Sequence, residues 1–212
     1  MRHKKQVGRF LEQPELRRLG VDVQMIQGAI EYTYKVLDAL DSTLVHAGEP
    51  RMAGLLELAN LSAIIGNLFR GGLARASSGR FVANGPHKYP DLLSKDKRYG
   101  DLEIKVALEN NKPKGHLVKP GPHITVRYVL GNEDGTCTRG KENRGAVAWI
   151  WEVRGGMLLE HHFSVSNTAG DSGKTAVFNK DGMTALKVVF LDSERRPVLP
   201  RRGGSDDDGT LS

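Results

Sequence analysis

Apolar side chains recur at helical spacing through the first third of the chain. Between residues 14 and 46 they fall three or four positions apart, which is typical of one face of an α-helix. Pro14 suits a first helical turn, and the pair Gly48 and Pro50 follows the last apolar position. The same spacing predicts a second helix over residues 52–69, ended by two glycines at 71 and 72.

The hydrophobic period changes to two beyond residue 100. Leu102, Ile104, Val106 and Leu108 alternate with Glu103, Lys105 and Ala107, so the first set should face a core and the second should face away. More strands are expected in ITVRYVLG, in GAVAWIWEV and MLLEHHFSVS on either side of a turn at Gly155-Gly156, in TAVF and in ALKVVFL. Helices followed by several strands predict an α/β fold with a mixed sheet.

The same patterns divide the chain into three parts. Residues 1–13 lack an apolar period and are expected to form a flexible basic arm. Residues 14–192 carry the periodic segments and should form one domain, helical over 14–72 and sheet-forming over 73–192. Residues 193–212 are rich in proline, glycine and charge, so they have little to bury and predict a disordered tail.

Composition narrows the class of protein. Hydrophobic residues make up 39% of the 212 positions, which is enough apolar material for one core. No run approaches the roughly 18 apolar residues of a membrane span, and the basic N-terminus lacks the apolar stretch of a signal peptide. The single cysteine, Cys137, excludes an internal disulfide and agrees with a reducing compartment. We therefore expect a cytoplasmic protein.

The net charge favours an acidic partner. Lysine and arginine exceed the acidic residues to give a formal charge of +6, which suits the contacts with phosphate that a nucleic-acid-binding protein makes. Basic residues lie on both sides of the segment YPDLLSKDKRYGDLEIKVAL (89–108), including Arg75, Arg80 and Lys88 before it and Lys112, Lys114 and Lys119 after it.

This segment carries an acid, a second acid and a lysine where apolar strands are expected. If the two strands pair, Asp91 can lie beside Glu103 on the face that also carries Asp101 and Lys105. Paired carboxylates repel each other, and a divalent cation such as Mg²⁺ relieves that repulsion. A nearby lysine can then orient a water for phosphodiester hydrolysis. The alternative is the solvated face of an ordinary hairpin.

Glu57 adds a third acid. In a continuous helix over 52–69, Leu61, Ile64 and Leu68 fall within about 40° of Glu57, which places its carboxylate inside the apolar arc. Burial of an ionised carboxylate is costly unless a counter-charge is close. Glu57 is therefore expected either to pair with an arginine or cap a neighbouring loop, or to point at the site of Asp91 and Glu103.

Taken in order, Glu57, NGPHKYPDLL, GDLEIKVAL and the loop at Gly115-His116 resemble the PD-(D/E)xK nuclease superfamily, and the type II restriction endonucleases in particular. The likeness covers roughly residues 54–190, and its specific part is Pro90-Asp91 with Glu103-Ile104-Lys105. It implies a restriction-endonuclease-like mixed sheet flanked by helices. It also implies a homodimer that cuts both strands of duplex DNA with Mg²⁺.

The resemblance assigns roles to the residues that match the motif. Asp91 and Glu103 would bind the metal, Lys105 would serve the attacking water, and Glu57 would be an auxiliary acid. Asp101 could share the metal, although the proline before Asp91 favours Asp91.

Loop residues provide weaker candidates for DNA contacts. They are Lys112, Lys114, His116 and Lys119, together with Asn167 and Lys174 in a second polar loop. Two other functions remain open: a repair or recombination nuclease that selects DNA structure, and a DNA-binding protein that does not cut.

Overall fold

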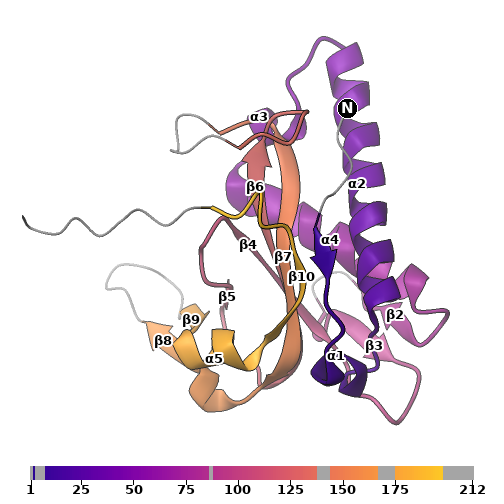
Figure 1. Ribbon diagram of the computed structural model, residues 1–212, viewed down its shortest axis with the longest axis vertical. Helices are drawn as coiled ribbons and strands as arrows, with labels where there is room; N and C mark the ends of the chain where they lie inside the picture. Colours follow the sequence, from indigo (N-terminus) through magenta and orange to yellow (C-terminus); the bar gives the residue numbers. More distant parts are fainter. Residues whose placement is uncertain (1, 3–7, 86–87, 138–143, 167–174, 198–212) are drawn as a thin grey trace, which may run out of the picture.

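A mixed five-stranded sheet forms the centre of the molecule (Figure 1). The structure is a computed structural model that describes residues 2, 8–85, 88–137, 144–166 and 175–197. The strand order is β1-β10-β7-β6-β4, in which β4 runs parallel to β6 and the other neighbours are antiparallel. The strands are β1 (Arg9–Phe10), β4 (Glu103–Leu108), β6 (Gly121–Gly131), β7 (Val147–Leu158) and β10 (Lys187–Leu191). The expected α/β fold with a mixed central sheet is confirmed.

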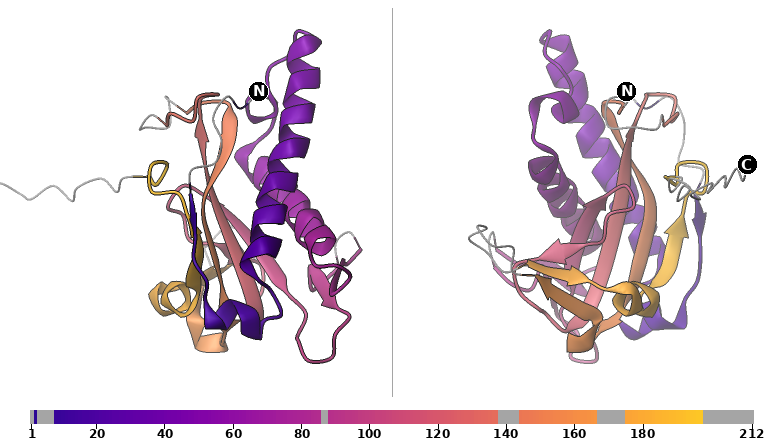
Figure 2. Two further views of the ribbon diagram at one scale, coloured as in Figure 1. Left: turned by 45° about the vertical axis from the view of Figure 1, so that its right-hand side comes forward. Right: turned by 90° about the vertical axis from the view of Figure 1, so that its left-hand side faces the viewer.

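The two long helices pack on one face of this sheet, and a short helix and a small three-stranded sheet lie over the other (Figure 2). The helices are α1 (Pro14–Arg18), α2 (Val23–His46), α3 (Met52–Leu55), α4 (Leu58–Ala76) and α5 (Lys180–Ala185), with a 3-10 turn at Glu160–His162. The smaller strands are β2 (Phe81–Ala83), β3 (Leu92–Ser94), β5 (Lys114–Gly115), β8 (Phe163–Ser166) and β9 (Thr175–Phe178). β2 pairs with β3, while β5, β9 and β8 form a three-stranded sheet.

The core lies between the helices and the apolar face of the sheet. Alternate residues of β4, β6 and β7 meet buried side chains of α2 and α4, among them Ile104, Val126 and Val153 from the sheet and Ile30 and Phe69 from the helices. The face of β4 that we expected to point to solvent is also covered, because the β5-β9-β8 sheet and α5 lie on that side. Glu103 and Ala107 are therefore buried rather than exposed, contrary to the sequence-based expectation.

The first predicted helix is two helices. The chain turns at Gly20, whose φ of +78° is favoured by glycine, before α2 begins. Asp22 caps α2 by accepting a hydrogen bond from the Met25 amide at 2.8 Å.

The second predicted helix is also interrupted, which corrects the prediction for Glu57. Leu56 and Glu57 adopt extended backbone angles between α3 and α4, so the continuous helical phase used for Glu57 does not hold. Glu57 is exposed at the N-cap of α4, and its expected burial is wrong. α4 also continues beyond the predicted stop, because Gly72 packs against α2: an added Cβ would lie 2.8 Å from Ala29 Cα.

The two glycines at 155 and 156 do not form the expected turn. β7 continues through them to Leu158. Their missing side chains allow close approach of neighbouring segments: a Cβ on Gly155 would lie 2.9 Å from Leu16 Cδ1, and one on Gly156 would lie 3.1 Å from the Ala185 carbonyl oxygen.

Residues from both predicted flexible ends pack against the domain. Arg9 and Phe10 of the expected basic arm form β1, and Phe10 packs on Phe190 with ring centroids 4.9 Å apart. In the expected tail, Arg195 is buried over the Trp149 ring and pairs with Asp192. Residues 198–212 lie outside the described part of the chain. No helix among the described residues is long and apolar enough to cross a membrane.

Candidate active site

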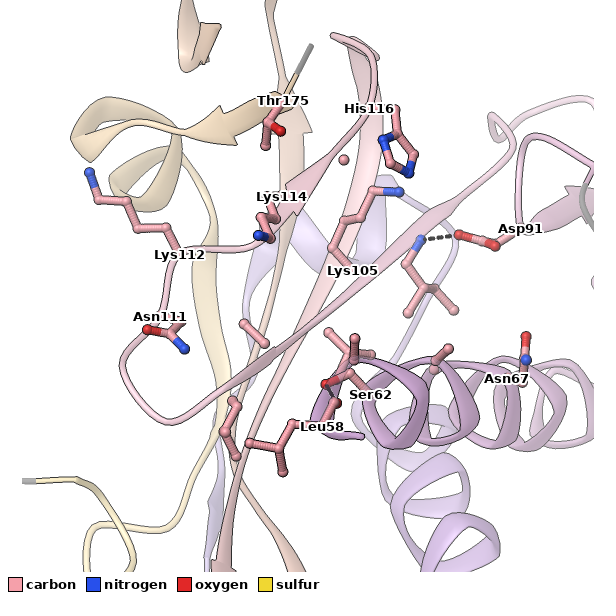
Figure 3. Close-up of a pocket in the computed structure, with 18 of the residues that line it drawn as sticks. Leu58, Ser62, Asn67, Asp91, Lys105, Asn111, Lys112, Lys114, His116 and Thr175 are labelled. Carbon is pink, nitrogen blue, oxygen red and sulfur yellow. Dashed lines mark hydrogen bonds between the residues drawn. The ribbon is translucent and has the colours of Figure 1, made fainter. Parts of the chain in front are cut away.

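A cleft of about 1130 Å³ runs along β4, the edge strand of the central sheet (Figure 3). Helix α4 forms one wall, and the segment 111–119, which includes β5, forms the other. β5 is held in place by pairing with β9. The cleft therefore lies where the free edge of a strand meets a helix and a lysine-rich segment.

Asp91 lies at one end of the cleft, immediately before β3. A single bridge between Leu92 and Leu102 joins this segment to the chain leading into β4, in place of the longer strand pairing that we expected. Asp91 Oδ2 accepts a hydrogen bond from the Ile104 amide at 2.8 Å, and Oδ1 lies 3.9 Å from Arg70 Nη1. Burial, together with the nearby charge of Glu103, raises the pKa of Asp91 despite the Ile104 bond and the neighbouring cations.

Glu103 and Lys105 lie on β4, on either side in sequence of Ile104, whose amide binds Asp91. Lys105 Nζ lies 2.6 Å from Glu103 Oε1, and Lys119 Nζ lies 3.1 Å from that same oxygen. The Glu103 side chain is only 4% exposed. Burial alone would raise its pKa, but the hydrogen bonds and charges of Lys105 and Lys119 outweigh burial and hold the pKa of Glu103 below its usual range.

The structure brings Asp91, Glu103 and Lys105 together but places the other two predicted acids elsewhere. Asp101 is exposed, precedes β4, and accepts a hydrogen bond from the Ser94 amide at 2.8 Å. It stabilises the turn between β3 and β4. Glu57 is absent from the residues that line the cleft. Its assignment as an auxiliary acid stays a prediction.

Two helix residues near Asp91 were not identified from the sequence. Asn67 lines the cleft from α4 at the end where Asp91 lies (Figure 3), and Arg70 forms the ion pair with Asp91 described above. They are three positions apart and so lie on one helix face. That spacing was available in the sequence, but its relation to Asp91 depends on how α4 packs against β4.

The predicted loop contacts fall into two groups. Lys112, Lys114, His116 and Lys119 all line the cleft, and Arg144 lines it as well. Figure 3 shows Lys105 extending toward His116. Asn167 and Lys174 lie outside the described residues. The cleft thus presents several cationic side chains to whatever enters it.

A second charged cluster lies on the same face of the sheet but away from the cleft. On β6 and β7, Arg127 Nη1 lies 3.3 Å from Glu152 Oε1, and Arg154 Nη2 lies 2.9 Å from Glu152 Oε2. Arg154 also donates to the carbonyl oxygen of Met183 in α5 at 2.9 Å. We call Glu103, Lys105 and Lys119 the edge cluster, and Glu152, Arg127 and Arg154 the central cluster.

The carboxylates of Asp91, which lines the cleft, and of Glu103, which is bonded to the cleft residue Lys105, fit a magnesium ion by their chemistry. Within the described residues no group of three or more histidine, cysteine, aspartate or glutamate side chains gathers as a metal site. Mg²⁺, however, is commonly held by one or two carboxylates, with waters and substrate phosphate oxygens supplying the rest. Asp91 and Glu103 provide two carboxylates close enough that the charge of Glu103 helps to raise the pKa of Asp91.

Comparison of the chain with protein-family models, with curated proteins and with solved structures finds no match. The function must therefore be inferred from the chemistry of the cleft and from the motif that its residues form.

Proposed function

We propose that this protein is a Mg²⁺-dependent, site-specific endonuclease of the type II restriction class, acting on double-stranded DNA. One observation carries the proposal: Asp91 and Glu103, with Lys105 2.6 Å from Glu103, lie at one strand edge beside a cationic cleft. These are the residues at which the sequence resembles the PD-(D/E)xK nucleases. We also propose that the mixed sheet and its flanking helices form a restriction-endonuclease-like fold.

Each side chain has a role in this reaction. Asp91 and Glu103 would hold the metal, which when bound supplies polarisation of the phosphate and a lowered pKa for water. The Lys105 ammonium would orient the attacking water and offset the negative charge that develops on the scissile phosphate. Lys112, Lys114 and His116 would contact neighbouring phosphates and fix the register of the duplex.

The proposal includes a homodimer. A palindromic target presents two equivalent scissile bonds, and a two-fold axis between protomers would place one active site at each. Cleavage would leave 5′-phosphate and 3′-hydroxyl ends, as the family resemblance implies.

A DNA-binding protein that does not cut is the second candidate. The pairing of both lysines with Glu103 favours it, because a carboxylate with two ammonium partners is also a stable structural ion cluster. A nuclease that selects DNA structure would use the same active site as the proposed site-specific nuclease, but it would produce different fragments.

The deciding experiment incubates the full chain with a long duplex of known sequence and Mg²⁺, alongside Lys105→Ala and Glu103→Ala. Discrete fragments from the wild type that both variants fail to produce would support a site-specific nuclease. Lys35→Ala, an exposed change on α2, is the matched control and should cut like the wild type. A wild type that retards DNA in a gel but leaves it intact with Mg²⁺ would favour the binding protein.

A further inference from the structure

Two ammonium groups share one buried carboxylate oxygen in the edge cluster. Lys105 Nζ and Lys119 Nζ lie 2.6 Å and 3.1 Å from Glu103 Oε1, and both side chains line the cleft. One carboxylate needs only one such partner for charge balance. The second ammonium therefore lies on an oxygen that the proposed function assigns to a metal ion.

The two lysines differ in how they are held. Lys105 extends from β4, two residues from Glu103 on the same strand face. Lys119 belongs to the segment between β5 and β6, and besides Glu103 it contacts the face of Tyr89, with Nζ 3.9 Å from the ring centroid. Tyr89 is 52% exposed, so this contact lies at the protein surface, while Lys119 itself lines the cleft. Lys119 can leave Glu103 for the cleft opening by rotating its own stem.

Charge makes that departure necessary when a divalent ion binds. A divalent ion at Glu103 Oε1 would be a third cation there and is repelled by both ammonium groups, and at separations near 4 Å each such repulsion is substantial even in a partly hydrated site. A DNA phosphate in the cleft offers the displaced ammonium a new anionic partner.

We infer that Lys119 is an internal counter-ion that occupies Glu103 in the free protein and transfers to a DNA phosphate when duplex enters the cleft. This inference rests on the proposed function and adds a regulatory step to it. Occupation of Glu103 by Lys119 weakens metal binding before DNA arrives. By thermodynamic linkage, DNA then raises the affinity for the cation, and the cation raises the affinity for DNA by the same factor.

The test measures cation binding rather than cleavage. Mg²⁺ is titrated calorimetrically into the full-length protein without DNA, for the wild type, Lys119→Gln, Lys119→Arg and Lys112→Gln. Lys112→Gln is the matched control: it removes one positive charge from the same cleft, but the Lys112 side chain extends away from Lys105 (Figure 3). Lys119→Gln should bind Mg²⁺ about 5- to 150-fold more tightly than the wild type, the usual range of coupling between two sites. Lys112→Gln and Lys119→Arg should stay within about threefold of the wild type, since arginine keeps the charge on Glu103.

The same titration with Ca²⁺, another cation that prefers oxygen ligands, is repeated in the presence of a short duplex. Addition of DNA should raise cation affinity strongly in the wild type and less in Lys119→Gln.

Two failures are distinguishable. If Glu103→Gln abolishes cation binding but Lys119→Gln leaves it unchanged, or if Lys119→Arg increases it as much as Lys119→Gln does, the counter-ion role is overturned and the nuclease proposal stands. If no protein shows cation binding that depends on Glu103, with or without DNA, both are overturned.

Discussion

The edge cluster and the central cluster have the same arrangement of charges but different cations and different surroundings. Each joins one glutamate on the polar face of the sheet to two basic side chains. In the central cluster the cations are arginines, one of which also bonds to the α5 backbone, and burial lowers the pKa of Arg127. In the edge cluster the cations are lysines that line an open cleft, with Asp91 nearby.

The difference teaches how position in a sheet separates a structural ion pair from a candidate reactive one. Arginine has a rigid planar fork that suits a fixed buried pair, whereas lysine carries a compact charge on a flexible stem. At the centre of the sheet both neighbours are strands, so a charged group has nowhere to move. At the edge of the sheet, Glu103 can exchange one cation for another through the cleft.

The largest expected difference concerns reaction rate. Lys105→Met should lower DNA cleavage by about 10²–10⁴-fold, the usual contribution of a group that assists proton transfer. Arg154→Met, the matched change in the central cluster, should leave the rate of the folded protein nearly unchanged. Fragment yield over time, measured well below the unfolding temperature, checks both. Equal losses of rate would erase the functional distinction between the clusters.

Stability should show the opposite order. Glu152→Ala leaves Arg127 and Arg154 without their carboxylate in a closed site, so the free energy of unfolding should fall by about 3–5 kcal/mol. Glu103→Ala should cost less, because Lys105 and Lys119 can reach water through the cleft. Urea unfolding at pH 7 compares the two. A larger loss for Glu103→Ala would show that the edge cluster is the more important for the fold.

Asp91, next to the edge cluster, should make the stability of the protein depend on pH. Because its pKa is raised in the folded state, ionised Asp91 opposes folding at neutral pH, and this cost is absent at low pH where the group is protonated in both states. Asp91→Asn should therefore be more stable than the wild type at pH 8, and the gain should shrink as pH falls through the raised pKa. Cleavage should be lost in the variant at every pH. A constant difference in urea midpoint from pH 8 to pH 4 would contradict this assignment.

The smallest effect concerns the charge of the cleft wall. Lys114→Gln should lower the slope of log affinity for duplex DNA against log salt by about one unit, because one phosphate contact is lost. Lys35→Gln, an equal charge change on α2, should leave the slope unchanged. Fluorescence anisotropy at several salt concentrations distinguishes them. Equal slopes for Lys114→Gln and the wild type would place DNA outside the cleft.

The sequence predicted the elements better than their ends. Period-two alternation located β4, β6, β9 and β10, since side chains on a strand must alternate between its faces. The same alternation could not reveal that residues 160–166 and 175–186 lie over the polar face. Glu103 was therefore expected at the surface and is buried.

Glu57 and Asp91 show which parts of a site can be inferred without coordinates. The meeting of Asp91 with Glu103 followed from a local motif and a short connection between them. The placement of Glu57 relied on one uninterrupted helix, and a two-residue break at Leu56-Glu57 changed the phase of every later position. Asn67 and Arg70 were missed for the complementary reason: helix spacing shows which residues share a face but not what that face meets.

The position of β4 at the border of the central sheet has a consequence for solubility. An unpaired border strand offers its free amides and carbonyls to any extended peptide, including one from a second copy of the chain, and such pairing can lead to aggregation. Here the border is flanked by α4 and by repeated lysines, whose mutual repulsion opposes the approach of an identical border. The cationic groups that would attract a polyanion thus also oppose pairing between two copies of this border strand.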